Sequence, residues 1–434
     1  MHDTFGALQA AAACERTVLP SGLTVLVRPM PGYSGAHVIY GTRFGSVDSV
    51  FTLDKGDGQG PVKVTLPAGV AHFLEHKMFE SEEGDAFSQY AKTGANANAY
   101  TSFDRTCYLF TATQQLGESL DILLGMVGKP YFTCETIAKE QGIIGQEINM
   151  YDDSPDWRLL TALCQCLYHS HPIRQDIAGT VDSISRITPE LLYACTDAFY
   201  NPGNMVLAAA GNITSEEVLA ACRRAGLCEP RTPYRVQRQV TPEPEQLAAR
   251  RMEFAMPVSK PCLGLGFREQ PLAQGAAGLE KRIICDMLTE LVCGGTTPLY
   301  RKLYDEGLIN PEFDGDFIAV EGALCILFTG ESDAPETVRE LLLAEIARLR
   351  AEGVDEELFT LCKNRMYGEM LTDLEAIEDT ASALASSYLQ GYTLYEELQA
   401  LASLTKQKVD EALQTMLLEK NCATVLIRPL EVEI

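Results

Sequence analysis

The chain has 434 residues, which is too long for one ordinary hydrophobic core, so we expect two domains. Hydrophobic residues make up 46% of the chain and charged residues 22%, and these values argue against a disordered or fibrous protein. The 60 acidic residues outnumber the 35 basic ones, and the resulting net charge of −25 argues against nucleic acid or a membrane surface as a partner.

The sequence also bears on localisation. No stretch approaches the ~20 apolar residues of a membrane span. The first residues lack the basic segment that opens a secretory signal peptide. The 14 cysteines are scattered without a CxxC pair, which is typical of reduced thiols. We therefore expect a cytoplasmic protein.

Hydrophobic periodicity predicts the elements of the first half. In chain order these are strands at 17–29 and 37–46, a loop at 46–63, helices at 70–80 and 84–93, a hairpin of 97–103 and 106–111, helices at 114–127 and 133–151, and a strand at 205–210. Pro155 is expected to end the last of these helices.

Residues 228–251 are rich in proline and arginine and are predicted to be a linker. Beyond it, in chain order, we expect strands and helices at 252–266, 279–292, 317–329, 335–352, 355–371 and 423–428, of which the first, third and last are strands. This order repeats that of the first half. The sequence therefore predicts an α+β fold of two similar domains, 1–227 and 252–434, each a mainly antiparallel sheet with helices on one face.

The segment His72-Phe-Leu-Glu75-His76 carries the strongest chemical signal. On a helix His76 lies about 40° from His72, and Glu75 lies about 60° to the other side, so all three project from one face. Two such imidazoles can hold a Zn²⁺ ion, with the carboxylate beside it to accept a proton from a water that the ion acidifies. The alternative is a pair of histidines in ordinary core or solvent contacts.

A hydrolytic zinc site needs a third protein ligand. The predicted helix 133–151 offers Glu140 and Glu147, which are seven residues apart and lie on or beside its apolar stripe. That stripe is expected to consist of Ile137, Ile143, Ile144 and Ile148. Carboxylates at a buried edge need a partner, which a metal and its histidines would supply, although a surface helix with flanking acids gives the same pattern.

These residues together resemble the pitrilysin, insulysin and mitochondrial processing peptidase family of zinc metallopeptidases, and most of all its small bacterial members. Glu147, 71 residues after His76, matches the family's third ligand, and Glu140 matches its supporting glutamate. The resemblance implies one Zn²⁺ per chain held by His72, His76 and Glu147, with Glu75 as catalytic base. It also implies two similar domains that enclose a chamber.

The segment from Gly94 to Thr101 resembles the family's active-site edge strand. A peptide can add to such an edge through main-chain hydrogen bonds, which would hold its scissile bond over the metal. Asn98 would then bond the substrate backbone and Ala99 would allow close approach. The alternative for Asn98 is an ordinary residue of a hairpin strand.

The second half departs from the family pattern. Active members carry an Arg and a Tyr there that hold the substrate carbonyl, and this sequence has Tyr304 and Asn310 at the matching places. Arg301 is close by, but at a different helix angle. Loss of such donors typically costs a factor of about 10²–10³ in rate. A paralogous subunit that supplies the missing pair, or a homodimer, is therefore expected.

Two functions follow from these observations. The first is a zinc-dependent endopeptidase, or the zinc-bearing subunit of one, that hydrolyses extended or unfolded peptides. The second is a non-catalytic peptide-binding or assembly subunit of a related complex. Loss of the Arg/Tyr pair favours the second, whereas the intact HxxEH segment with Glu147 favours the first.

Overall fold

The computed structural model describes residues 12–56, 58, 60–82 and 84–430. The start of the chain, on which the expectation about a signal peptide rests, lies mostly outside them. The chain forms two compact units, each assembled from three segments. Unit 1 comprises 1–148, 176–239 and 370–398, and unit 2 comprises 149–175, 240–369 and 399–434.

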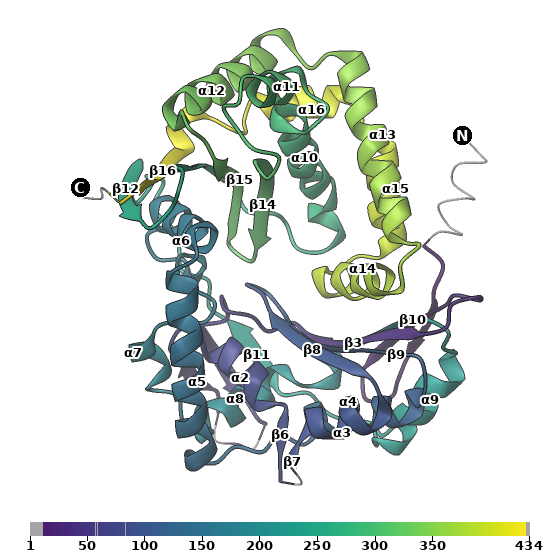
Figure 1. Ribbon diagram of the computed structural model, residues 1–434. Helices are drawn as coiled ribbons and strands as arrows, with labels where there is room; N and C mark the ends of the chain where they lie inside the picture. Colours follow the sequence, from purple (N-terminus) through teal and green to yellow (C-terminus); the bar gives the residue numbers. More distant parts are fainter. Residues whose placement is uncertain (1–11, 57, 59, 83, 431–434) are drawn as a thin grey trace. The chain divides into compact units, whose positions relative to one another are not determined.

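Unit 1 is built on a six-stranded sheet (Figure 1). Its strands, in spatial order, are β1 (Glu15–Val18), β2 (Thr24–Pro29), β10 (Met205–Gly211), β3 (Ala36–Thr42), β9 (Thr106–Ala112) and β8 (Asn96–Thr101). Neighbouring strands are antiparallel except β2 and β10, which are parallel. The hairpin of β8 and β9 places β8 at the edge of the sheet.

Unit 2 repeats this topology with five strands. Their order is β12 (Arg251–Met256), β16 (Cys422–Pro429), β13 (Cys262–Glu269), β15 (Ala323–Glu331) and β14 (Asp314–Val320). The first pair is again parallel and the others are antiparallel. The strands match β2, β10, β3, β9 and β8 one for one, which confirms the predicted α+β fold of two similar domains.

Helices follow the strands in both halves. Those of the first half are α2 (Val70–Lys77), α3 (Ala86–Thr93), α4 (Leu116–Gly128), α5 (Cys134–Asp152), α6 (Pro155–Leu167), α7 (Val181–Ile184), α8 (Pro189–Phe199) and α9 (Ser215–Arg224). Those of the second half are α10 (Ala276–Cys293), α11 (Pro298–Asp305), α12 (Pro335–Glu352), α13 (Glu356–Asp373), α14 (Ile377–Gln390), α15 (Leu394–Ser403) and α16 (Lys406–Leu413). Helix α5 ends at Asp152, just before Pro155, as predicted. Pro155 is also the first residue of α6, a position where the missing N–H of proline costs no hydrogen bond.

Each half of the chain contributes one helix to the unit whose sheet is formed mainly by the other half. Helix α14 packs on β3 and β10 of unit 1, on the face opposite α3 and α4 (Figure 1). Helix α6 packs on β13 and β16 of unit 2. Glycines allow the second contact, since a Cβ at Gly264 would lie 2.8 Å from Cδ1 of Leu163. The units therefore differ from contiguous halves 1–227 and 252–434, and helices cover both faces of the unit 1 sheet, not one.

The prediction of a loop at 46–63 is wrong in part. Residues there form β4 (Val50–Asp54) and the start of β5 (Val62–Thr65). Both belong to a small antiparallel sheet whose third strand is β11 (Arg235–Arg238), inside the expected linker. The single strand expected at 317–329 is instead the β14–β15 hairpin, which turns at Gly322 with a φ of +82°.

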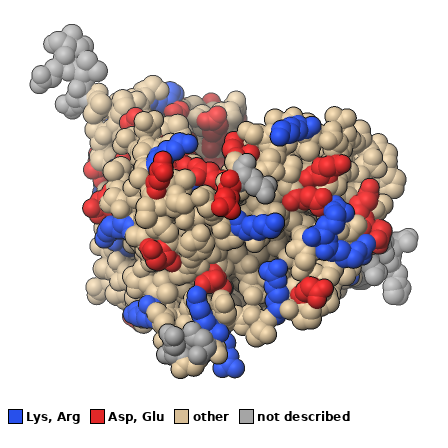
Figure 2. Space-filling view, turned by 90° about the horizontal axis from the view of Figure 1, so that it is seen from below, with Lys and Arg blue, Asp and Glu red and all other residues tan. Residues whose placement is uncertain are grey.

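The acidic surplus does not form a single-sign field on the face drawn in Figure 2, where Lys and Arg alternate with Asp and Glu. Within the described ranges, no helix is both long and apolar enough to cross a bilayer. All 14 cysteines fall in those ranges and are free thiols, most of them buried.

The exchange of α6 and α14 predicts that neither half is stable alone. Cutting the chain after Gln239 leaves the unit 1 sheet without α14 and the unit 2 sheet without α6, so apolar sheet faces become exposed. Fragments 1–239 and 240–434 should each aggregate or unfold without a cooperative transition, and should form a soluble one-to-one complex when coexpressed. Size-exclusion chromatography and circular dichroism check this. A cooperative, monomeric fragment 1–239 would show that α14 is dispensable.

Candidate metal centre

The start of α2 is held by a close approach of two chain segments. Gly69 precedes the helix with a φ of +91°, and a Cβ there would lie 2.4 Å from the carbonyl oxygen of Ala178. Gly179 has the reciprocal constraint, because its Cβ would lie 2.5 Å from the carbonyl oxygen of Ala68. The Ser183 hydroxyl donates to the same Ala68 carbonyl at 2.8 Å. These contacts fix where the first turn of α2 begins.

Three side chains that the sequence proposes as ligands converge. Nε2 of His72 lies 3.6 Å from Oε1 of Glu147, and Nε2 of His76 lies 3.5 Å from Oε2 of Glu147. One ligand atom from each of the three residues can be chosen such that all lie within 4.8 Å of one another. Helix α2 supplies both imidazoles and α5 supplies the carboxylate.

The spacing of these atoms fits a metal better than hydrogen bonds. A nitrogen–oxygen hydrogen bond is normally 2.7–3.2 Å long. Two ligands each about 2.0–2.2 Å from one tetrahedral ion lie about 3.3–3.6 Å apart. The Glu147 contacts, at 3.5 and 3.6 Å, fall in the second range. The two nitrogens and one carboxylate are also the donor set that zinc prefers in hydrolytic sites.

Glu140 orients one of the two imidazoles. Its Oε1 lies 3.0 Å from Nδ1 of His76, so Nδ1 carries the proton and Nε2 is left to face Glu147. Burial disfavours the charged form of His76, but the hydrogen bond to Glu140 and the nearby carboxylates outweigh it and raise the pKa of His76. The same contact lowers the pKa of Glu140 against the effect of its burial.

His72 is the more deeply placed imidazole, with 7% of its surface exposed. Burial, with a smaller contribution from His76, lowers the pKa of His72 to about 4, although Glu147 and Glu140 oppose this. The ring is therefore neutral near pH 7, as a metal ligand must be. Its Nδ1 is buried with no hydrogen-bond partner among the described residues, a cost that folded proteins concentrate at functional sites.

Glu75 lies on the same helix and is held by a residue that sequence reasoning did not single out. The Thr101 hydroxyl, at the end of β8, donates to Oε2 of Glu75 at 2.7 Å. Burial raises the pKa of Glu75, and the Thr101 hydrogen bond and the charge of His76 offset part of the rise. A carboxylate with a raised pKa is a stronger base. Thr101 ends the segment that resembles the family's edge strand, and that position is the sequence signal that could have identified it.

The apolar stripe of α5 differs from the expected one at a single position. Ile137, Ile144 and Ile148 are buried, but Ile143 is 47% exposed. Glu140 is buried beside the stripe, with 6% of its surface exposed. Part of the buried face of α5 is therefore occupied by a carboxylate that bonds His76 and not by an apolar side chain.

Asn98 and Ala99 lie on β8, the edge strand, which packs against α2. The Asn98 side chain is exposed, and its Oδ1 accepts a hydrogen bond of 2.9 Å from the N–H of Ala99. Nothing in the described chain pairs with the outer edge of β8. Both residues are thus on the edge where a peptide strand can add.

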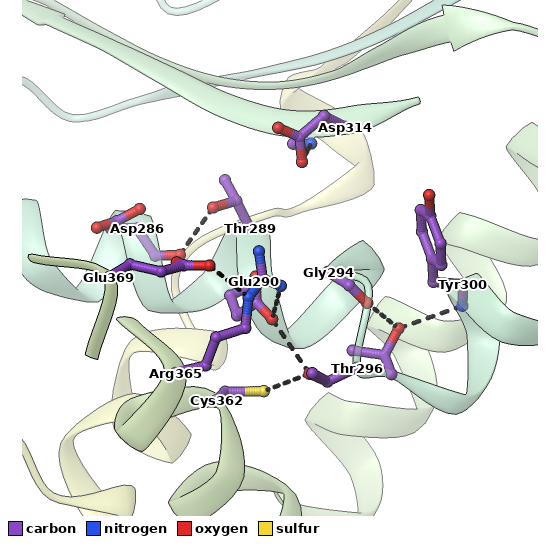
Figure 3. Close-up of polar contacts among 12 residues, drawn as sticks. Asp286, Thr289, Glu290, Gly294, Thr296, Tyr300, Asp314, Cys362, Arg365 and Glu369 are labelled. Atoms are coloured by element: carbon purple, nitrogen blue, oxygen red, sulfur yellow. Dashed lines mark hydrogen bonds and ion pairs between the residues drawn. The ribbon is translucent and has the colours of Figure 1, made fainter. Parts of the chain in front are cut away.

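The equivalent place in unit 2 holds an ion pair. Helix α10 contacts β14 and β15 as α2 contacts β8 and β9, and α13, like α5, is the second helix after the hairpin. Glu290 of α10 accepts two hydrogen bonds, of 2.7 and 2.9 Å, from Arg365 of α13. Arg365 also bonds Glu369, so the guanidinium lies between two carboxylates (Figure 3).

The residues at the family's Arg and Tyr positions make other contacts in unit 2. Tyr304 on α11 is 49% exposed, and its ring stacks on Tyr300. Asn310 donates from Nδ2 to Oε2 of Glu331 at 3.2 Å. Arg301 is exposed on α11. The sequence-based prediction that this chain lacks the family's Arg/Tyr pair stays a prediction.

Comparison with known proteins gives the family. Residues 66–181 match the model of the insulinase family (peptidase family M16), and residues 186–366 match the peptidase M16 inactive domain. A Bacillus subtilis protein named as an uncharacterized zinc protease, YmfH, is 35% identical over 91% of this chain and 92% of its own. A Mycobacterium leprae protein, also named as a zinc protease, is 26% identical over 98% of this chain and 93% of its own.

Comparison with solved structures gives the same family. The crystal structure of an M16-like peptidase from Alicyclobacillus acidocaldarius has a TM-score of 0.91 and 33% identity, and the match covers 96% of this chain and 98% of that one. Pitrilysin, at 16% identity and a TM-score of 0.75, shares the fold over 96% of this chain and 45% of its own. The chain therefore belongs to peptidase family M16, the insulinase family.

Proposed function

We propose that this protein is the zinc-bearing component of a metalloendopeptidase that hydrolyses extended or unfolded peptides. The observation that carries the proposal is the convergence of His72, His76 and Glu147 beside Glu75. These three residues would hold a Zn²⁺ ion, which would supply Lewis acidity to polarise a carbonyl and to acidify a water.

The chain's own residues then have separate roles. Glu75 accepts a proton from the attacking water and returns it to the leaving nitrogen. Thr101 holds Oε2 of Glu75 and so fixes the orientation of the carboxylate. Glu140 fixes the tautomer of His76. The edge of β8, with Asn98 and Ala99, aligns the peptide through main-chain hydrogen bonds, which favours extended chains over particular sequences.

A second candidate function, a non-catalytic peptide-binding subunit, is favoured by Tyr304 and Asn310 at the places of the family's Arg and Tyr. We favour the first because a binding subunit gains nothing from a buried base that a threonine holds in place.

The role of Glu75 can be tested by substitution. Glu75→Gln keeps the shape of the side chain and its contact with Thr101 but removes the base. We expect peptide turnover to fall by about 10²–10⁴, while bound zinc stays near one per chain by elemental analysis. Glu135→Gln, at an exposed position on α5, is the matched control. If zinc is lost together with turnover, Glu75 is a structural part of the metal site and not its base.

The role of Glu140 predicts a different outcome. Glu140→Gln weakens the hydrogen bond that orients His76, so we expect the dissociation constant for zinc to rise by about 10–100-fold. Titration against a competing chelator measures this, with Glu135→Gln again as control. Equal zinc affinity in the two variants would contradict the role given to Glu140.

The partner requirement is also a proposal. The chain alone should turn over peptides slowly, and a paralogous chain that carries the family's Arg and Tyr should raise the rate by about 10²–10³. The double substitution Tyr304→Arg with Asn310→Tyr should give part of that gain without a partner. Peptide turnover by the unmodified, purified chain at ~1–10³ s⁻¹, the usual range for enzymes, would refute the requirement.

A further inference from the structure

A second candidate site lies in unit 1, among residues that the metal centre does not use. A pocket of about 450 Å³ lies between β3, α4, α8, the end of α9 and the segment that follows it. Its volume is in the range of small-molecule sites. The apolar part of the wall includes Leu124 and Leu227.

The charges that line the pocket do not cancel. Asp121 is paired with Arg224, and Asp197 is paired with Lys55. The other two cations, Lys129 and Arg231, are both exposed and have no carboxylate within ion-pair distance in the described part of the chain. The pocket is therefore locally positive in a protein whose net charge is −25, and it favours an anion.

The wall of the pocket contains a largely buried tyrosine. Tyr40 lines it from β3 with only 3% of its surface exposed. Its hydroxyl makes no hydrogen bond to any described residue, whereas Tyr200, on the same wall, bonds Tyr108 at 2.8 Å. Burial raises the pKa of Tyr40 and the charge of Arg231 opposes the rise, so the phenol is a neutral donor with a cation close by.

We propose that this pocket binds a small amphipathic anion. The carboxylate or phosphate oxygens of the ligand accept a hydrogen bond from the Tyr40 hydroxyl and lie beside Arg231 and Lys129. Its apolar part packs on Leu124 and Leu227. The proposal is independent of zinc and of peptidase activity.

Isothermal titration of the full chain with four probes tests this proposal. Octanoate and octyl phosphate carry both the head and the apolar part, octanamide lacks the charge, and inorganic phosphate lacks the apolar part. We expect one or both of the first two to bind, and to bind more tightly than octanamide and phosphate. The comparison of octanoate with octyl phosphate tells which head the site prefers.

Substitutions locate the binding. Arg231→Gln should weaken binding about tenfold, because it removes a charge-assisted contact. Tyr40→Phe should weaken it about three- to tenfold, because it removes one hydrogen bond. Arg223→Gln is the control, since Arg223 neighbours Arg224 but is exposed and paired with Glu216. Arg231 is exposed, so its variant folds even if Tyr40→Phe does not. Equal affinity for octanoate, octyl phosphate and octanamide, or equal loss in Arg231→Gln and Arg223→Gln, would overturn the proposal.

Discussion

The structure depends on one electrostatic constraint, which is that Glu75, Glu140 and Glu147 lie around two largely buried imidazoles. Carboxylates placed this close repel one another, and burial adds the cost of removing their hydration. Hydrogen bonds from His76 to Glu140 and from Thr101 to Glu75 offset part of that cost. Glu147 faces both Nε2 atoms at distances too long for good hydrogen bonds. A divalent cation at that point would offset the repulsion, so the same side chains that destabilise the site without a metal would favour the site with one.

The duplicated fold shows two solutions to the same constraint. Both units bring a helix that contacts the edge hairpin together with a second helix, and both place acidic side chains there. In unit 1 the compensating groups are imidazoles that can share a metal. In unit 2 Arg365 carries a permanent charge, and its Nη1 donates to both carboxylate oxygens of Glu290 (Figure 3). An arginine keeps its proton and has no free electron pair, so it cannot serve as a metal ligand as the imidazoles of unit 1 can. The match of this half to the family's inactive domain agrees with that difference.

How much the sequence predicts depends on how local the interaction is. Helix periodicity alone predicts that the HxxEH residues share one helix face. The third ligand, Glu147, is predicted from the family resemblance, which gives its separation from His76 along the chain. The bounds of α12 are predicted to the residue, because its apolar repeat and Pro335 are local signals. The sequence does not predict strands β4 and β5, since the third strand of their sheet, β11, lies about 180 residues beyond β4 in a segment that is predicted to be a linker. Likewise, no local signal indicates that α6, from the first half of the chain, packs on the unit 2 sheet. The same is true of α14, which comes from the second half and packs on the unit 1 sheet. The sequence pattern predicts a buried Ile143, because periodicity does not distinguish the edge of an apolar stripe from its centre.

Gly69, which precedes α2, and Gly179, which packs against the same turn, have a consequence for how the candidate metal ligands are held in place. Gly69 and Gly179 let two backbones touch, with no side chain between them that could rearrange to absorb a displacement. A shift of the segment around Ala178 would therefore be transmitted directly to the first turn of α2, which carries His72. The amide protons of the two segments should then become solvent-accessible in the same opening event, so that the ligand helix and a loop one hundred residues downstream behave as one cooperative element.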